Sequence, residues 1–407
     1  MNIITLTEIQ FKNYSRIHSK RNYLQSIEYA NLEKEKGYTP QYIGMLDDNN
    51  NLVAASLILS KKIIGKYYFG YIPGGYLIDY NNYDLLENFT NLLKDYLNKL
   101  NYVYISITPL ATIKITNKMK NVIYTNNNII SNLEKLGYKK SKKSSITTNL
   151  CLKTNGNTKK TYDNFSRFVK RNIRENELKG ITIYKGEEKD LDVFYKLIQK
   201  KTNYDKKYYS DFFKYFDNEN NKFEIYFARL DTSVYLKNYN ALLNKEKTTN
   251  NNLSKKILDI NIKNKDYLIN KKIASDKLIE KYNTEIKKAI LLNNLYKDGI
   301  IAACVAIIKT NNKINFLVEG YEEKIRDIRA SYSIKWEIIK EYSKQGYTLF
   351  NLGYIPNNNN NKEPTNKFNG IFLSRLGFNA DIYDFPETYN LIINNYFYTL
   401  INFIEPK

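Results

Sequence analysis

Cysteine and histidine are scarce in this chain of 407 residues, and their scarcity excludes several classes of chemistry. Cys151 and Cys304 are the only cysteines, and two isolated thiols form neither a disulfide framework nor a zinc site. The one histidine, His18, lies in the segment "IHSKRNYLQS", which is typical of a helix start. A Ser-His-Asp or Cys-His centre would depend wholly on His18, so we expect this side chain to lie on the surface or to pack against a helix.

Long apolar runs are absent as well. No segment approaches the roughly 18 consecutive apolar residues of a membrane-spanning helix. The first residues, "MNIITLTEIQFKNY", have neither a basic start nor a long apolar run, so no signal peptide is predicted. We therefore expect a cytoplasmic protein, and its surplus of cations leaves open a peripheral contact with the inner face of the membrane.

Positive charge is what the chain has in excess. The formal net charge of +21 at pH 7 favours a polyanionic partner such as nucleic acid, an anionic membrane or a phosphorylated substrate. Heavy use of Asn, Lys, Ile and Tyr leaves a second explanation, which is a nucleotide bias toward lysine codons. A hydrophobic content of 43% is that of a folded globular protein, and the length predicts two or three domains.

Strands and helices alternate in two successive units. The first unit contains a hairpin at 41–60, a strand in "KYYFGYIPGG", a leucine-rich helix in "YDLLENFTNLLKDYLNKL" and a closing strand at 146–153. A similar order returns after a basic helix that ends at Gly180. This repetition predicts an α+β protein in which one fold is duplicated in tandem.

A helical insertion interrupts the second unit. Between 236 and 298, mostly apolar positions recur in alternating steps of three and four, with polar exceptions at Glu246, Asn250 and Asn293, which predicts a heptad seam in two segments. Lysines outnumber acidic residues there, so a protruding antiparallel arm could hold a structured RNA by its phosphates. The alternative is a pair of amphipathic helices packed on the body. The predicted domain limits are 1–153 for the first unit, 154–235 with 299–407 for the second, and 236–298 for the arm.

Several segments, taken in order, resemble the FemABX family of peptidoglycan bridge aminoacyltransferases. They include "QSIEYANLEKEKGY" and "YIPGGYLIDY" in the first unit, and "VKRNIRENELKGI" and "FNGIFLSRLGFNADIYDF" in the second. The resemblance implies two GNAT-like acyltransferase subdomains in tandem with an inserted antiparallel coiled-coil arm. It also implies that an amino acid moves from aminoacyl-tRNA to an amine on the stem peptide of lipid II or of its UDP-linked precursor. No metal or cofactor is expected, and association with other bridge-forming transferases is left open.

Two candidate catalytic positions follow from the resemblance. Arg375 in "GIFLSRLGF" falls where the family places a lysine implicated at the tRNA acceptor end, and a guanidinium keeps that charge. A surface arginine before a strand is the alternative. Thr108 in "ISITP" stands where many members have an aspartate, and threonine cannot act as a base near neutral pH. Either base catalysis is dispensable and the tRNA ribose hydroxyl relays the proton, or this protein is impaired or altered in its use of the acceptor.

The acceptor side also departs from the family pattern. Glu33 takes the place of a phosphate-contacting lysine, although Lys34 and Lys36 flank it. Tyr204 takes the place of an arginine with the same task, and Lys206 lies nearby. Two aromatic residues match positions that line or flank the acceptor cleft, with helix packing or core packing as the alternatives. They are Tyr208 and Phe316.

A basic helix face is the candidate tRNA contact. Lys170, Arg171 and Arg174 share this face, because Arg174 follows the other two at helical spacing. A solvated charged face is the alternative. For the Gly-Gly turn of "YIPGGYLIDY" we favour a structural turn over a phosphate cradle, because Gly74 stands where the family usually has arginine.

The departures at Glu33, Thr108 and Tyr204 leave two other functions open. One is a non-catalytic paralogue that binds tRNA or precursor without turnover. The other is a tRNA-dependent transferase with a different acceptor, such as a protein N-terminus or a lipid.

Overall fold

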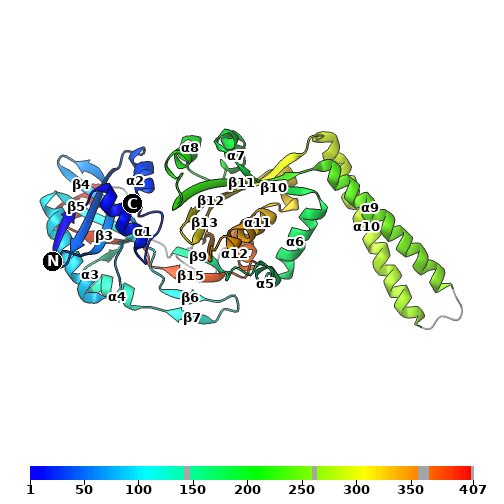
Figure 1. The fold of residues 1–407 in the computed structure, drawn as a ribbon, viewed down its shortest axis with the longest axis horizontal. Helices are drawn as coiled ribbons and strands as arrows, with labels where there is room; N and C mark the ends of the chain where they lie inside the picture. Colours follow the sequence, from blue (N-terminus) through cyan, green and yellow to red (C-terminus); the bar gives the residue numbers. More distant parts are fainter. Residues whose placement is uncertain (142–146, 259–263, 356–365, 405–407) are drawn as a thin grey trace.

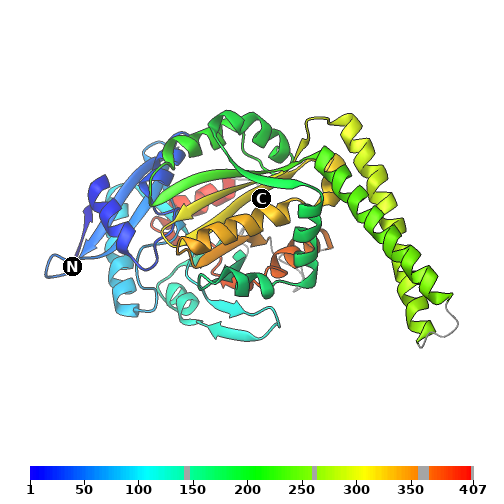
Figure 2. The same cartoon turned by 45° about the vertical axis from the view of Figure 1, so that its right-hand side comes forward.

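The computed structural model describes residues 1–141, 147–258, 264–355 and 366–404. Two β-sheets, each accompanied by helices, lie side by side, and a long helical hairpin projects from the end of the second (Figures 1 and 2). We call the first sheet with α1 to α4 the first lobe, and the second sheet with its helices the second lobe. The helices of the first lobe are α1 (Glu8–Ile17), α2 (Ile27–Lys34), α3 (Tyr83–Lys99) and α4 (Asn128–Lys135).

The first sheet has apolar clusters on both of its faces, so alternate residues of its strands are buried in different clusters. Leu86, Phe89 and Leu93 of α3 belong to one cluster, and Phe11 of α1 with Ala30 of α2 belong to the other. The strands, in spatial order among the described residues, are β1 (Asn2–Thr5), β2 (Thr39–Leu46), β3 (Leu52–Ile64), β4 (Tyr67–Gly74), β5 (Tyr102–Pro109), β16 (Tyr389–Ile392) and β8 (Lys139–Lys140).

The second sheet is longer, and its central strands are buried on both faces. Their sequences are accordingly near-continuous apolar runs, as in "IIAACVAII". The strands, in spatial order among the described residues, are β10 (Ile181–Gly186), β11 (Asn221–Leu230), β12 (Ile300–Thr310), β13 (Lys313–Tyr321), β14 (Leu349–Ile355), β9 (Thr147–Lys153), β15 (Asp381–Phe385), β6 (Lys114–Thr116) and β7 (Val122–Thr125). The helices around it are α5 (Thr158–Asp163), α6 (Arg167–Leu178), α7 (Leu191–Ile198), α8 (Lys206–Tyr215), α11 (Ser331–Lys344) and α12 (Asn366–Leu376), and two short 3₁₀ helices lie at Glu188–Asp190 and Glu323–Ile328.

Each sheet contains a parallel strand pair, and the two pairs differ. In the first sheet, β4 and β5 stay paired from Tyr68 opposite Tyr102 to Gly74 opposite Pro109. In the second sheet, β13 and β14 pair only over their first residues, as far as Asn315 opposite Asn351. Beyond that point the two strands separate, which opens the sheet to side chains from neighbouring helices.

Strand pairing crosses between the two units in both directions. The strand predicted to close the first unit is present as β9, but it lies in the second sheet between β14 and β15. In return, β16 near the C-terminus pairs with β5 of the first sheet. The expectation for 146–153 was therefore wrong about the sheet, because an alternating apolar pattern identifies a strand and not its partner. The domain limits themselves stay a prediction.

The predicted arm is present as α9 (Thr232–Ile257) and α10 (Lys265–Leu295), which project away from both sheets (Figure 2). Asp231 caps the start of α9 through the backbone amides of Ser233 and Val234. Polar groups meet in the seam where the heptad pattern is imperfect, since the Ser275 hydroxyl donates to Glu246 at 2.5 Å. The α+β class with two sheet-bearing lobes and a projecting helical arm is confirmed, and the packed-helix alternative is wrong.

The remaining helix, α13 (Asn395–Ile404), follows β16 and covers part of the first sheet. The ring of Phe397 lies 3.9 Å from that of Tyr67, and the ring of Tyr398 lies 5.1 Å from that of Tyr104. Within the described ranges, no helix combines the length and the apolar content needed to cross a membrane.

Candidate functional site

An aromatic cluster joins the two lobes where α2 lies against α8 (Figure 1). Lys36, just after α2, forms an ion pair of 2.8 Å with Glu33. The Lys36 ammonium also lies 4.7 Å and 4.2 Å from the ring centroids of Tyr204 and Tyr208 of the second lobe. Those two rings stack with their centroids 4.0 Å apart. Three of the predicted acceptor positions therefore meet in one place, together with Glu33.

Phenol groups surround this ion pair and are held in the neutral form. Burial raises the pKa of Tyr208 far above its ordinary value, and the neighbouring Tyr204 adds to the shift. Burial also raises the pKa of Tyr38 and Tyr71, with a further contribution from the Glu33 carboxylate. These hydroxyls can therefore donate hydrogen bonds to an anionic or carbonyl-rich ligand at neutral pH.

Thr108 belongs to the edge of the same cluster. Its side chain is hydrogen-bonded to the hydroxyl of Tyr71. Its Oγ1 also lies 3.0 Å from Oγ1 of Thr388, in the segment that leads into β16. Thr108 is thus held by neutral hydroxyl groups, which suits a positioning role better than proton abstraction.

Three other predicted acceptor residues point elsewhere. Lys34 lies 3.6 Å from Glu8 of α1, because successive residues of a helix point in different directions. Lys206 pairs with Asp192 of α7 at 2.7 Å. Phe316 is buried in the core of the second lobe. The structure places all three outside the aromatic cluster.

A second cluster of polar side chains lies where β13 and β14 separate. The Arg375 guanidinium donates from Nη1 to the carbonyl oxygen of Tyr354 at 2.8 Å, while its Nε is buried without a hydrogen-bond partner among the described residues. It lies so close to Gly353 that a Cβ there would be 2.9 Å from Nη2. The predicted cation is therefore fixed against the strand that opens the sheet.

An acid and a lysine accompany Arg375. Glu319 of β13 accepts a short hydrogen bond from the buried Lys335 of α11. Burial alone would raise the pKa of Glu319, but Lys335 and Arg375 together lower it below its ordinary value. The cluster thus carries two cations for one carboxylate, and an anion or a developing oxyanion would balance it.

The predicted tRNA-contacting residues share a groove on α6 beside the arm. Arg167, Lys170, Arg171 and Arg174 line this groove, whose volume is about 360 Å³. Lys281 of α10 pairs with Glu175 of α6 at 3.1 Å, which ties the base of the arm to this helix. A phosphate backbone lying in the groove would therefore also run along the arm.

The Gly-Gly turn is filled by neighbouring side chains. Gly74 and Gly75 have φ values of 74° and 76°, which favour glycine. A Cβ at Gly75 would lie 2.4 Å from the hydroxyl oxygen of Tyr80, which accepts a hydrogen bond from the Tyr76 amide. This crowding supports the structural turn over the phosphate cradle.

The thiols and the histidine take no part in these groups. Burial raises the pKa of the Cys151 thiol to about 12, and burial raises that of Cys304 as well. The pKa of His18 is lowered, first by burial and then by Lys20. Where the chain is described, no three His, Cys, Asp or Glu side chains gather as metal ligands.

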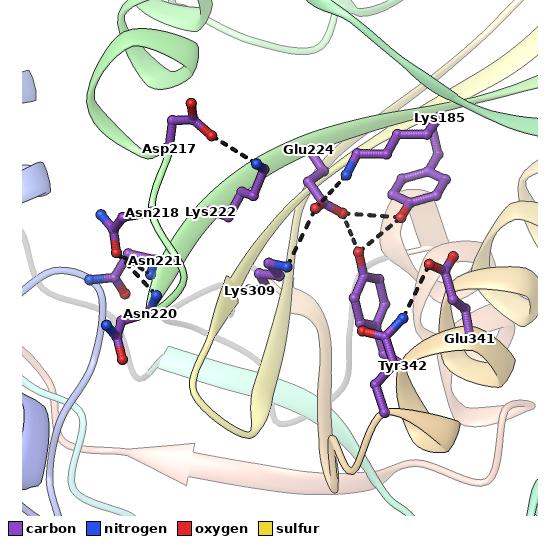
Figure 3. Close-up of polar contacts among 12 residues, drawn as sticks. Lys185, Asp217, Asn218, Asn220, Asn221, Lys222, Glu224, Lys309, Glu341 and Tyr342 are labelled. Carbon is purple, nitrogen blue, oxygen red and sulfur yellow. Dashed lines mark hydrogen bonds and ion pairs between the residues drawn. The ribbon is translucent and has the colours of Figure 1, made fainter.

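Sequence reasoning missed a buried carboxylate network in the second sheet, because its members lie far apart in the chain. Figure 3 shows Glu224 of β11 between Lys185, Lys309 and Tyr342. The Lys185 ammonium lies 2.6 Å from the Glu224 carboxylate, and the Tyr226 hydroxyl donates to it at 3.0 Å. Glu224 is almost fully buried, and its partners come from separate strands and from α11, so this network fastens the strand ends to that helix.

Comparison with known proteins identifies the family. A family model described as the FemAB family matches residues 6–406, which is nearly the whole chain. The chain belongs to the FemAB family. Aminoacyltransferase FemA of Staphylococcus epidermidis is 20% identical over 98% of both chains. Aminoacyltransferase FemB of the same species is 23% identical and covers 100% of this chain and 98% of its own.

A solved structure agrees with this membership. The crystal structure of FemX superposes with a TM-score of 0.71 at 16% sequence identity, over 98% of this chain and 100% of its own. The fold of this FemAB protein is therefore that of FemX. Together with the names of its relatives, this identifies the chain as an aminoacyltransferase.

Proposed function

We propose that this FemAB protein transfers an amino acid from aminoacyl-tRNA to an amine on the stem peptide of a peptidoglycan precursor. The observation that carries the proposal is the presence of two separate groups of side chains, one suited to the acceptor and one suited to the donor ester. The aromatic cluster around Lys36 offers a binding surface between the lobes, and Arg375 offers a fixed cation where the second sheet opens.

The acceptor would bind at the aromatic cluster. The neutral hydroxyls of Tyr38 and Tyr71 suit the carbonyl groups of a peptide, and the stacked rings of Tyr204 and Tyr208 suit its apolar parts. Lys36 would supply a positive charge for an acceptor phosphate or carboxylate. The acceptor is either lipid II or its UDP-linked precursor.

The donor would approach along the arm and α6. Phosphates of the tRNA would bind Lys170, Arg171 and Arg174, and the charged acceptor end would reach Arg375. The neutral amine of the acceptor then attacks the ester carbonyl, and the Arg375 guanidinium stabilises the oxyanion that forms. When the ester carbon–oxygen bond breaks, the departing ribose oxygen takes up the proton that the amine loses and becomes a hydroxyl group. This route needs no base at Thr108.

A transfer assay tests the proposal. Purified protein is mixed with pools of labelled aminoacyl-tRNA and with lipid II or the UDP-linked precursor, and label on the acceptor is measured. We expect transfer, and we expect Arg375→Ala to lower the rate by about 100-fold, as for loss of one oxyanion donor. Arg326→Ala is the matched control, because that arginine is exposed on the surface.

The other outcomes separate the remaining functions. Binding of tRNA or precursor without transfer would identify a non-catalytic paralogue. Transfer to a protein N-terminus or to a simple lipid alone would identify a transferase with another acceptor. An unchanged rate for Arg375→Ala would remove Arg375 from the reaction and leave the acceptor assignment standing.

A further inference from the structure

The hairpin between β3 and β4 ends in exposed apolar residues. Ile63 and Ile64 are 37% and 56% exposed, at a place where a turn usually carries polar side chains. Gly65, with a φ of 53°, makes the turn that brings the chain back. Isolated apolar side chains are common on protein surfaces, so these two indicate a binding surface only if their neighbours extend the apolar patch.

The neighbours extend the apolar surface onto two other elements. Tyr67, paired with Ile64, packs against Phe397 of α13. On α13, Tyr396 and Leu400 are 74% and 40% exposed and lie one turn apart. On the other side of the hairpin, Tyr68 is hydrogen-bonded to the loop that contains the exposed Leu100. We call the exposed side chains of this hairpin and of α13 the apolar rim.

Cations accompany the rim, and acids do not. Lys61, Lys62 and Lys66 are exposed on the hairpin, and none forms an ion pair with a described residue. Neither 60–71 nor 395–401 contains an aspartate or glutamate. Exposed isoleucine and tyrosine with unpaired lysines match the boundary of an anionic bilayer, where apolar groups enter the acyl region and cations contact the headgroups.

Part of the rim lies on the same hairpin as a lysine that contacts the border of the aromatic cluster. The Lys61 ammonium lies 5.4 Å from the ring centroid of Tyr38, which borders that cluster. At about 3.3 Å per strand residue, Ile64 is roughly 10 Å beyond Lys61 along β3. The first lobe forms the end of the molecule opposite the arm, so a bilayer at the rim would leave the arm free (Figure 1).

From these relationships we infer that the apolar rim binds an anionic lipid surface and presents the aromatic cluster to an acceptor whose diphosphate is attached to a lipid. The second half of this inference rests on the proposed function, whereas the first half does not. The rim gives the enzyme access to a headgroup that stays at the membrane, so a lipid-linked acceptor is favoured over a soluble nucleotide-linked one.

Vesicle sedimentation with the full-length protein tests the rim directly. We expect binding to vesicles of equal parts phosphatidylglycerol and phosphatidylcholine, weaker binding at raised salt, and little binding to phosphatidylcholine alone. Ile63→Ser with Ile64→Ser, and separately Lys62→Glu with Lys66→Glu, should each lower the partition coefficient by about tenfold or more. All four side chains are exposed, so circular dichroism should find these variants folded.

Matched controls come from the exposed surface of α10. Ile290→Ser with Leu291→Ser, and Lys271→Glu with Lys287→Glu, remove the same kinds of group and should leave vesicle binding unchanged. The inference is overturned if the wild-type protein ignores anionic vesicles or if the rim variants bind as well as it does. Self-association lost in the rim variants, without vesicle binding, would also overturn it and assign the rim to a second copy. Vesicle binding without aminoacyl transfer would contradict the proposed function, and with it the lipid-linked acceptor, while the lipid binding of the rim would stand.

Discussion

The Lys36 ammonium lies 4.2 Å from the centroid of the Tyr208 ring, and the two residues belong to different lobes. A hydrogen bond also joins the two lobes here, because the Tyr215 hydroxyl of α8 donates to Glu35 at 2.6 Å. The aromatic cluster therefore exists only when the lobes are held together, and its residues should act on the acceptor as a unit.

Lys36→Met tests the role of this contact. The substitution keeps an apolar stem and removes the charge, so we expect the KM for the acceptor to rise by about 5- to 30-fold, which corresponds to a loss of about 1–2 kcal/mol. The control is Lys34→Met, because Lys34 lies outside the cluster. Steady-state kinetics with varied acceptor would contradict the assignment if both variants gave the same KM.

Gly353→Ala tests whether Arg375 must stay where it is. The new Cβ would meet Nη2 at 2.9 Å, and the φ of 105° adds backbone strain. We expect kcat for aminoacyl transfer to fall by about tenfold, in keeping with misplacement of a catalytic group, while the acceptor KM stays the same. Gly346→Ala is the matched control, because φ is 90° there and no atom lies within 4 Å of the new Cβ. Equal losses in the two variants would attribute the effect to backbone strain.

Glu224→Ala tests the buried network of Figure 3. The substitution would leave Lys185 and the hydroxyls of Tyr226 and Tyr342 without their shared acceptor. We expect the free energy of unfolding to fall by about 3–5 kcal/mol, measured by urea titration followed by circular dichroism. Glu219→Ala should change it by no more than about 0.5 kcal/mol, because that residue is exposed. A small effect at Glu224 would mean that the network adds little to stability.

Asp231, which caps the arm, should make stability depend on pH. Hydrogen bonds from Val234 and Ser233 lower the pKa of its carboxyl below the ordinary value. The ionised form is therefore favoured in the folded state, so the stabilisation is present above the ordinary pKa and is lost as the pH falls through the lowered one.

Two substitutions separate the charge from the cap. Asp231→Asn should keep the cap and remove this acid dependence, whereas Asp231→Ala should lose about 1 kcal/mol at neutral pH. A series of urea unfolding midpoints, measured from pH 7 down to acidic pH, reports both the acid dependence and the loss of the cap. If the acid dependence of the wild type persisted in Asp231→Asn, another carboxylate would be responsible.

The sequence could predict features whose signal is local. The heptad spacing within each helix predicted the seam between α9 and α10, and Tyr239 and Tyr282 do contact each other across it. Lys36, Tyr204 and Tyr208 could be assigned to one site only through the resemblance to a family, because they lie far apart in the chain.

Features that depend on distant partners could not be predicted. Glu224 is a single acid in the apolar strand "FEIYFARL", and its partners Lys185 and Lys309 lie on other strands. The separation of β13 from β14 likewise has no sequence signal, because a strand's pattern reports burial rather than the length of its pairing. The site roles of Arg375 and Thr108 stay predictions.

The return of β16 to the first sheet affects how the protein can be made. Tyr389 to Ile392 pair with β5, whose other neighbour is β4, so until they arrive β5 is an open edge. During translation the first sheet therefore stays incomplete until residues 389–392 have left the ribosome. A fragment that stops before residue 389 should therefore tend to aggregate, and the two lobes are poor candidates for separate expression.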